Sequence, residues 1–205
     1  MKNLHFILTA VSAIILIGSI TAAAQDTAGH NAKSNDLFRK CSRAGAIYLE
    51  HFNSADEDRD ISILQLNAEA GYYILRGLSL NGNAYLFMAN GKRILEDAQP
   101  PVELNSDVQG AGLNGFIRWD VIRISSHSLY LEAGAGMVFT TKNFPPGGTP
   151  WNLTRRHGFG MSFRLTQHTR ILMGWRSMHI SNGKGFGHPQ NPAYDGSGLY
   201  LGFRF

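Results

Sequence analysis

The feature that most constrains the fold is a two-residue alternation of apolar residues with polar or glycine residues, which runs from residue 43 to the end. Alternation with a period of two is typical of β-strands that have two different faces. Eight segments carry it, at about 43–53, 61–74, 78–89, 108–122, 129–141, 153–165, 170–182 and 196–205. The sequence therefore predicts an all-β chain.

One face of these segments is continuous hydrocarbon, while the other holds glycine and charges of both signs. In the segment 129–141 the apolar set is Leu129, Leu131, Ala133, Ala135, Met137 and Phe139. The alternate set there is Tyr130, Glu132, Gly134 and Gly136. A soluble barrel would turn its apolar face inward and expose a more highly charged face to water. A small membrane barrel instead packs glycine and paired charges inside, so this pattern favours a transmembrane barrel.

The connections between the predicted strands alternate in length. Short turns are expected at 75–77, 125–128 and 167–169, and long links at 54–60, 90–107, 142–152 and 183–195. Outer-membrane barrels alternate short periplasmic turns with long extracellular loops in this way. The last segment also has apolar residues at alternate positions up to Phe205, as is common in outer-membrane proteins. We expect an eight-stranded antiparallel transmembrane β-barrel in the bacterial outer membrane.

The first residues have the pattern of a secretory signal: Lys2, an apolar run at 4–20 and a group of small residues before Gln25. Cleavage after Ala24 would make 1–24 a signal peptide, 25–42 an N-terminal periplasmic segment and 43–205 the barrel domain. A retained membrane helix is the alternative, but the apolar run is marginal in length for a span.

Charge and cysteine content exclude some classes of function. Loss of Lys2 with the signal leaves 18 of the 19 basic residues against 15 acidic ones. This small excess does not indicate nucleic-acid binding, but it is compatible with a surface that meets phosphorylated lipid. The single cysteine, Cys41, has no partner for an internal disulfide.

The residues that could carry chemistry lie in the last two predicted strands. In the segment 170–182, apolar residues at 171, 173 and 175 look lipid-facing, and the same parity places His179 and Ser181 on that outer face. A polar pair is costly there unless it has a purpose. Counting back along the last strand from Leu199 puts Asp195 on the same face.

Two residues along a strand span about 6.5 to 7 Å, so the side chains of His179 and Ser181 can meet if they lean together. The neighbouring antiparallel strand can bring Asp195 to the far nitrogen of the imidazole. This combination suits a serine nucleophile, a histidine base and an orienting acid. The alternative is that these are polar residues at a strand end beside a solvated loop acid.

The stretch from His179 to Asn182, followed by 191–195, resembles the C-terminal signature of the PagL-type lipid A 3-O-deacylases, also called the acyloxyacyl hydrolase family. That signature is His-x-Ser-Asn-Ala, a short spacer, and Asn-x-Gly-x-Glu or Asp before a last strand. The motif covers about 176–205, whereas the similar barrel layout covers most of the mature chain. Gly183 and Ala193 depart from the signature, and the spacer is about two residues longer.

The resemblance implies a barrel whose outward-facing triad hydrolyses the ester-linked acyl chain at the 3-O position of lipid A, in lipopolysaccharide. It implies that His179 is the base, Ser181 the nucleophile and Asp195 the acid, where Glu is usual. Asn182 matches an asparagine of the oxyanion hole, and Asn191 matches a loop asparagine near the substrate.

We expect no cofactor, because a serine and histidine pair generates its nucleophile by proton transfer. We also expect no metal, since His157, His168 and His188 lie in different strands and loops without ligand spacing. Outer-membrane lipids are the expected partners, and a homodimer is left open. Two other functions remain: a phospholipase with the same triad, and a non-enzymatic structural or adhesive barrel that acts through its long loops, above all 90–107.

Overall fold

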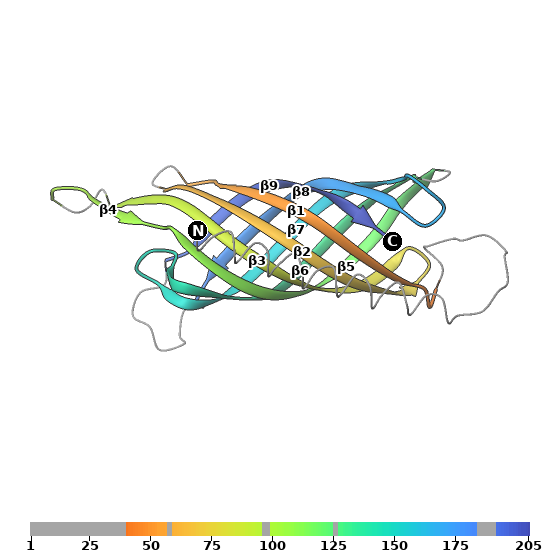
Figure 1. The fold of residues 1–205 in the computed structure, drawn as a ribbon, viewed down its shortest axis with the longest axis horizontal. Helices are drawn as coiled ribbons and strands as arrows, with labels where there is room; N and C mark the ends of the chain where they lie inside the picture. The colour runs from red at the N-terminus through yellow and green to blue at the C-terminus, as the bar shows by residue number, and fades with distance from the viewer. Residues whose placement is uncertain (1–39, 57–58, 96–98, 125–126, 184–191) are drawn as a thin grey trace, which may run out of the picture. The chain divides into compact units, whose positions relative to one another are not determined.

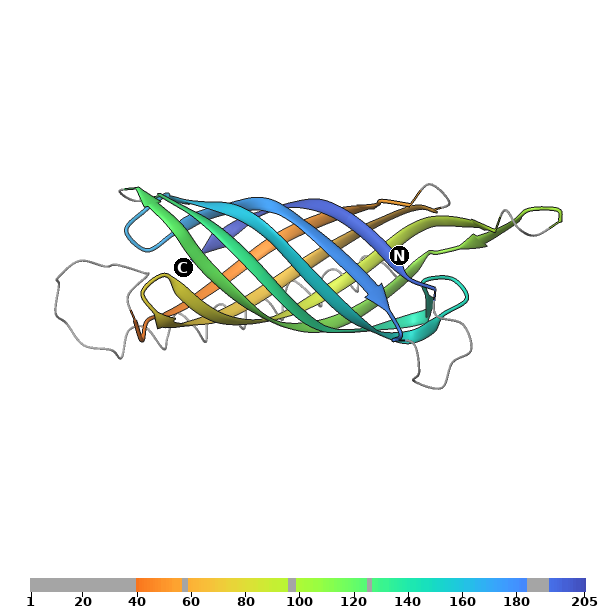
Figure 2. The same ribbon diagram turned by 180° about the vertical axis from the view of Figure 1, so that it is seen from behind.

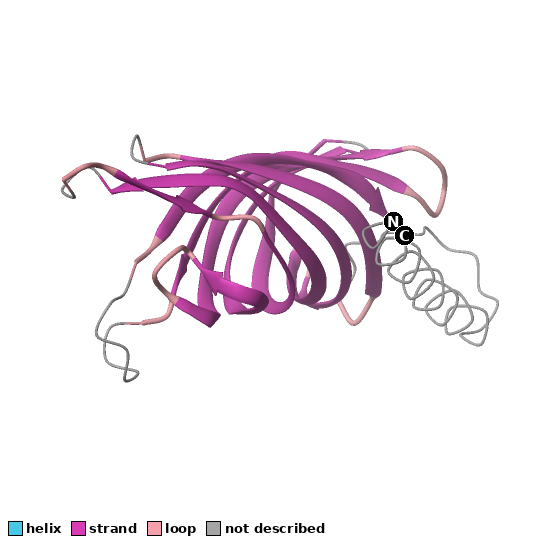
Figure 3. Ribbon diagram, turned by 60° about the vertical axis from the view of Figure 1, so that its left-hand side comes forward, coloured by secondary structure: helices cyan, strands magenta, loops and turns pink. Residues whose placement is uncertain are grey.

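The computed structural model describes residues 40–56, 59–95, 99–124, 127–183 and 192–205. The regular elements in these ranges are strands (Figure 3). They are β1 (Arg43–Ser54), β2 (Arg59–Leu75), β3 (Leu78–Leu95), β4 (Val102–Asn105), β5 (Val108–Ile124), β6 (His127–Phe144), β7 (Thr149–Arg164), β8 (Arg170–Ser181) and β9 (Tyr194–Arg204). Within the described ranges, no helix is long and apolar enough to cross a membrane.

Eight of the strands close into a barrel of tilted antiparallel neighbours (Figures 1 and 2). The order is β2-β1-β9-β8-β7-β6-β5-β3, and the pairing of β3 with β2 completes the ring. The first and last strands lie side by side, from Ala46 opposite Arg204 to Ser54 opposite Gly196. The predicted eight-stranded barrel is therefore confirmed.

The fourth strand in chain order, β4, is an addition to the ring. It pairs with residues Lys92 to Leu95 of β3, and this hairpin projects beyond one end of the barrel (Figure 1). The prediction that 90–107 is a loop was therefore wrong for most of that segment. The apolar and polar residues of β4 alternate over only four positions, and its exposed Glu103 forms an ion pair with Lys92 of β3, so the segment is too short and too polar to stand out as a strand in the sequence.

The two faces of the wall have the character that the alternation predicted. Outside, Leu113, Trp119 and Phe203 are each at least half exposed. Inside, Arg118 and Glu132 are buried. The apolar band therefore faces outward, as it must in a barrel that spans a membrane.

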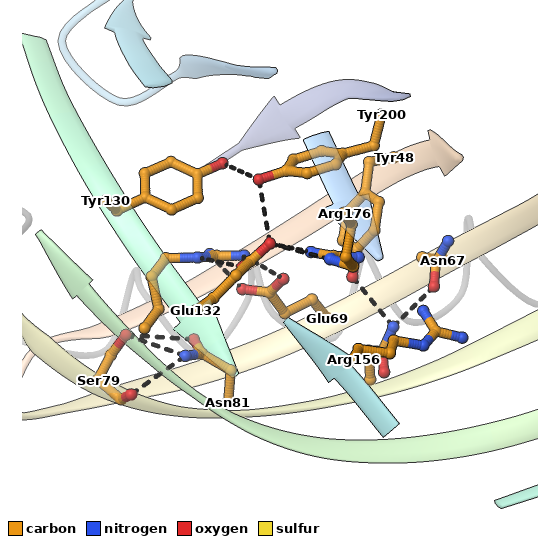
Figure 4. A network of polar contacts seen from close by, with 12 residues as sticks. Tyr48, Asn67, Glu69, Ser79, Asn81, Tyr130, Glu132, Arg156, Arg176 and Tyr200 are labelled. Carbon is orange, nitrogen blue, oxygen red and sulfur yellow. Dashed lines mark hydrogen bonds and ion pairs between the residues drawn. The ribbon is translucent and has the colours of Figure 1, made fainter. Parts of the chain in front are cut away.

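The interior is filled by a chain of ion pairs, part of which is shown in Figure 4. It runs Glu69–Arg118–Glu132–Arg176–Glu50–Arg156, with nitrogen–oxygen distances of 2.8, 2.9, 2.9, 2.6 and 3.1 Å along the chain. Three arginines and three glutamates balance, so the network is neutral. A cavity of about 10 Å³ beside it has room for about one water molecule. These side chains fill the middle of the barrel interior.

An apolar cluster fills the barrel where β6, β8 and β9 meet their connections. The end of β6 brings Phe144 inside, where its ring packs against Phe87 at 5.2 Å and Tyr194 at 5.9 Å between centroids. Asn152 Nδ2 donates hydrogen bonds to the main-chain oxygens of Phe144 and Thr149. This cluster supports the start of β9 from inside.

The predicted signal peptide, 1–24, and most of the predicted periplasmic segment, 25–42, lie outside the described residues. Both stay predictions. The first described strand begins at Arg43.

Candidate active site

Strands β8 and β9 hold the three residues that the sequence singled out. His179 is directly opposite Asp195 in the antiparallel register, and Ser181 is the last residue of β8. All three share the outward parity of Met173 and Leu199, which are exposed on the same two strands. The structure therefore brings them together on the outer wall, as the parity argument required.

The imidazole of His179 bridges the other two side chains. Its Nδ1 lies 2.8 Å from Oδ1 of Asp195, and its Nε2 lies 3.1 Å from Oγ of Ser181. With the ring proton on Nδ1 and donated to Asp195, Nε2 accepts a hydrogen bond from the serine hydroxyl. The His179 side chain is 29% exposed and that of Asp195 is 50% exposed, so a lipid can reach the site from outside. This geometry suits proton transfer from serine to histidine.

Main-chain contacts fix Asp195 at the start of β9. Its carbonyl oxygen accepts hydrogen bonds from the main-chain N–H of Ala55, at 2.8 Å, and from Oγ of Ser54, at 3.5 Å. The preceding residue, Tyr194, points inward and packs against the apolar cluster. A Cβ on Gly196 would lie 2.4 Å from the Tyr194 hydroxyl, so this glycine lets the ring lie flat along the strand.

Of the two asparagines predicted to lie at the site, the structure describes Asn182 and does not describe Asn191. The side chain of Asn182 is buried, whereas the neighbouring Ser181 is partly exposed on the outer wall. Its side-chain amide therefore does not share the surface of the triad, and its part in an oxyanion hole stays a prediction. Asn191 lies outside the described residues.

Arg155, which the sequence argument missed, also lies at this site. It is exposed on β7 and directly opposite His179, while Leu153 is opposite Ser181. The signal was present in the sequence, because Arg155 has the same odd parity as the lipid-facing Phe159 and Met161. Only the register between β7 and β8 shows that it neighbours the triad.

A broad apolar groove crosses the outer wall near the triad, with a volume of about 620 Å³. Its lining includes Leu64, Phe159, Met173, Trp175, Leu199 and Leu201. Trp175 and Leu199 lie four residues along their strands from His179 and Asp195, which is about 13 Å. The triad and the groove therefore follow the same two strands.

Among the described residues, no group of three or more His, Cys, Asp or Glu side chains is arranged to hold a metal ion. The expectation that the protein needs neither a metal nor an organic cofactor stays a prediction.

Comparison with known families matches residues 77–204 to the family described as Lipid A 3-O-deacylase (PagL). The chain belongs to the PagL family. The PagL motif in the sequence and the barrel fold agree with this membership. Family and fold together place the protein in the bacterial outer membrane. No curated protein matches the sequence.

Solved structures share the PagL barrel fold at low sequence identity. The crystal structure of Neisserial surface protein A is 13% identical with a TM-score of 0.56, and the match covers 79% of this chain and 95% of that one. The crystal structure of the outer membrane enzyme PagL is 15% identical with a TM-score of 0.50, covering 78% of this chain and 97% of that one. At these identities the likeness concerns the fold alone.

Proposed function

We propose that this PagL-family barrel is an outer-membrane serine esterase that removes the ester-linked acyl chain from the 3-O position of lipid A. Membership of the family supports lipid A as the substrate. The observation that carries the proposal is the contact of one imidazole with both Ser181 and Asp195 on the outer wall. A triad that faces outward in a membrane barrel meets its substrate within the lipid leaflet.

In the proposed reaction, Oγ of Ser181 attacks the ester carbonyl carbon while Nε2 of His179 takes the serine proton. Asp195 holds the ring in the required tautomer and stabilises the imidazolium that forms. The tetrahedral intermediate collapses when His179 returns the proton to the sugar oxygen, which leaves as an alcohol. Water, activated by the same imidazole, then hydrolyses the acyl-serine and releases a fatty acid.

The tetrahedral intermediate carries an oxyanion, which needs hydrogen-bond donors aimed at it. Asn182 follows the proposed nucleophile directly, as the family motif implies. Because its side chain is buried away from the triad, we propose that the main-chain N–H of Asn182 contributes to the oxyanion hole, and we keep Asn191 as a proposed contact near the substrate.

The apolar groove suits the acyl chain of such a substrate. From His179 to Met173 the strand runs six residues, or about 20 Å. At a strand tilt of about 40° this corresponds to roughly 15 Å of depth, which is half the hydrocarbon thickness of a bilayer. A chain attached at Ser181 can therefore lie along the groove within one leaflet.

The test is the mass of lipid A from cells that make the barrel. In a host whose lipid A keeps its 3-O acyl chain, the wild type should remove one acyl chain per lipid A, and Ser181→Ala should remove none. Ser177→Ala is the matched control, because Ser177 faces outward on the same strand four residues away and should leave deacylation intact.

Each alternative function has its own result in this experiment. Loss of acyl chains from phospholipids, with lipid A unchanged, would replace the proposal by the phospholipase. A folded Ser181→Ala barrel that still deacylates, or a wild type that changes no lipid, would remove the esterase assignment and favour a structural or adhesive barrel.

A further inference from the structure

Among the described residues, the outer wall beside the triad carries a cation whose role is unassigned, Arg155. It is exposed on β7, and His179 on β8 is its direct cross-strand neighbour. Side chains directly opposite each other in an antiparallel pair have Cβ atoms about 4.5 to 5.5 Å apart. The side chain of Arg155 therefore projects from the strand next to the one that carries His179 and Ser181, the groups proposed to cleave the ester.

The side chain of Arg155 makes no hydrogen bond or ion pair within the described part of the chain. Asp195, the acid at the same register, lies one strand further away and contacts His179 instead. A charged side chain on a lipid-facing wall is unfavourable unless it reaches the interface or meets a counter-charge. An anion from outside the protein would supply that counter-charge.

On the side of Arg155 that faces away from the triad, the outer wall is built from small residues. Its neighbour on β6 is Ala135, and the next residue in the same register, on β5, is Gly115. A Cβ on Gly115 would meet nothing within 4 Å, so this part of the wall is open. A bulky polar headgroup that contacts Arg155 can extend over these small residues on one side and reach Ser181 on the other.

We propose that Arg155 binds a phosphate group on the headgroup of the lipid being deacylated, and so selects phosphorylated lipids. This inference rests on the proposed function. A guanidinium forms two parallel hydrogen bonds to phosphate oxygens, which fixes the orientation as well as the position of the headgroup. Held there, the headgroup presents its ester to Ser181 while the acyl chain extends toward the groove.

The first experiment compares two substrates in detergent micelles: bisphosphorylated lipid A and the same lipid after enzymatic removal of both phosphates. Arg155→Gln should lower kcat/KM on the phosphorylated lipid by about 10- to 100-fold, mainly through KM, because a charge-assisted contact is lost. On the dephosphorylated lipid it should change kcat/KM less than about twofold. Arg155→Lys keeps the positive charge but cannot form the two parallel hydrogen bonds of a guanidinium. Its kcat/KM on the phosphorylated lipid should therefore lie between those of the wild type and Arg155→Gln.

Arg164→Gln is the control, since Arg164 is an exposed arginine on the same strand, at the last residue of β7. It should leave the rates on both lipids unchanged. An equal loss on both substrates in Arg155→Gln would overturn the phosphate contact and make Arg155 a structural residue. Rescue of the dephosphorylated lipid by added phosphatidylglycerol would overturn the assignment of the phosphate to the substrate itself.

A binding experiment separates this inference from the proposed reaction. The Ser181→Ala barrel should retain bisphosphorylated lipid A about tenfold more tightly than the dephosphorylated lipid, and the Ser181→Ala/Arg155→Gln barrel should not discriminate. If the wild type hydrolyses neither lipid but this discrimination holds, the esterase proposal fails and the phosphate site stands. If the wild type hydrolyses both lipids equally and neither barrel discriminates, the phosphate site fails and the esterase stands.

Discussion

The ion-pair network inside the barrel and the triad on its outer wall are both clusters of charged and hydroxyl side chains, in opposite surroundings. Inside, the two oxygens of Glu132 together accept hydrogen bonds from Arg118, Arg176 and Tyr200. Outside, Oδ1 of Asp195 contacts His179, and half of the Asp195 side chain remains exposed.

The difference between the clusters is whether their charged groups are buried and paired with an opposite charge. In the inner network the side chains are exposed by 6% or less and each charge faces an opposite charge, so the groups hold the wall together. In the outer cluster the imidazole lies between an acid and a hydroxyl that lipid can reach. Removal of an inner group should therefore affect folding, and removal of an outer group should affect chemistry.

The largest expected effect is in the outer cluster. Ser181→Ala and His179→Ala should each lower kcat/KM by roughly 10⁶-fold, and the double variant should lose no more, because the two groups act in one proton transfer. Asp195→Ala should cost roughly 10⁴-fold, since the acid orients the base without bonding to substrate. Single-turnover rates on purified barrels measure these losses.

The free energy of unfolding of the same variants should stay within about 0.5 kcal/mol of wild type, because their side chains face outward. The heat-dependent shift of the barrel on a gel is a simple check that each variant is folded. Losses that multiply in the double variant would show that Ser181 and His179 act independently, and the triad would then be wrong.

The next effect is in the inner network. Glu132→Ala leaves Arg118 and Arg176 buried without their shared carboxylate, which should lower the free energy of unfolding by about 3 to 5 kcal/mol. Reversible denaturation in lipid vesicles measures this. Deacylation per folded molecule should stay within a few-fold of wild type.

Glu103→Ala is the control for the inner variant, since its pair with Lys92 is exposed and should contribute less than about 1 kcal/mol. Equal stability losses in the two variants would mean that burial of the inner network adds nothing, and the contrast between the clusters would disappear.

The ring of strands could be predicted from the sequence because a membrane imposes one apolar face on each strand. The prediction of loops failed at 90–95 and 102–105, where β3 and β4 form a hairpin with exposed charges and no such constraint applies. It also failed at 142–144 and 149–152, which extend β6 and β7. Which residues face inward was also predictable, but their partners were not. Glu50 on β1 meets Arg156 and Arg176 across the barrel, a contact that depends on strand tilt and register.

The site was predictable to a similar extent. Parity alone placed His179 and Ser181 on one face, because they lie on one strand. The register that sets Asp195 opposite His179 depends on the link between β8 and β9, most of which lies outside the described residues, and here the family motif supplied the match. Arg155 was missed because it is a neighbour only through the pairing of β7 with β8. The catalytic roles themselves stay predictions.

The smallest expected effect compares two exposed leucines on the outer wall. Leu199 is 69% exposed and lines the groove near the triad, while Leu113 is 60% exposed on β5, outside the residues that line it. Leu199→Ala removes apolar surface from the path of the acyl chain and should lower kcat/KM about fivefold, or about 1 kcal/mol. Leu113→Ala changes no residue of the groove and should leave the dependence of kcat/KM on acyl-chain length unchanged. The measurement is the rate on esters of increasing chain length, where the loss in Leu199→Ala should grow with each carbon that reaches the groove. Equal rates for the two variants at every chain length would show that the acyl chain lies elsewhere on the barrel.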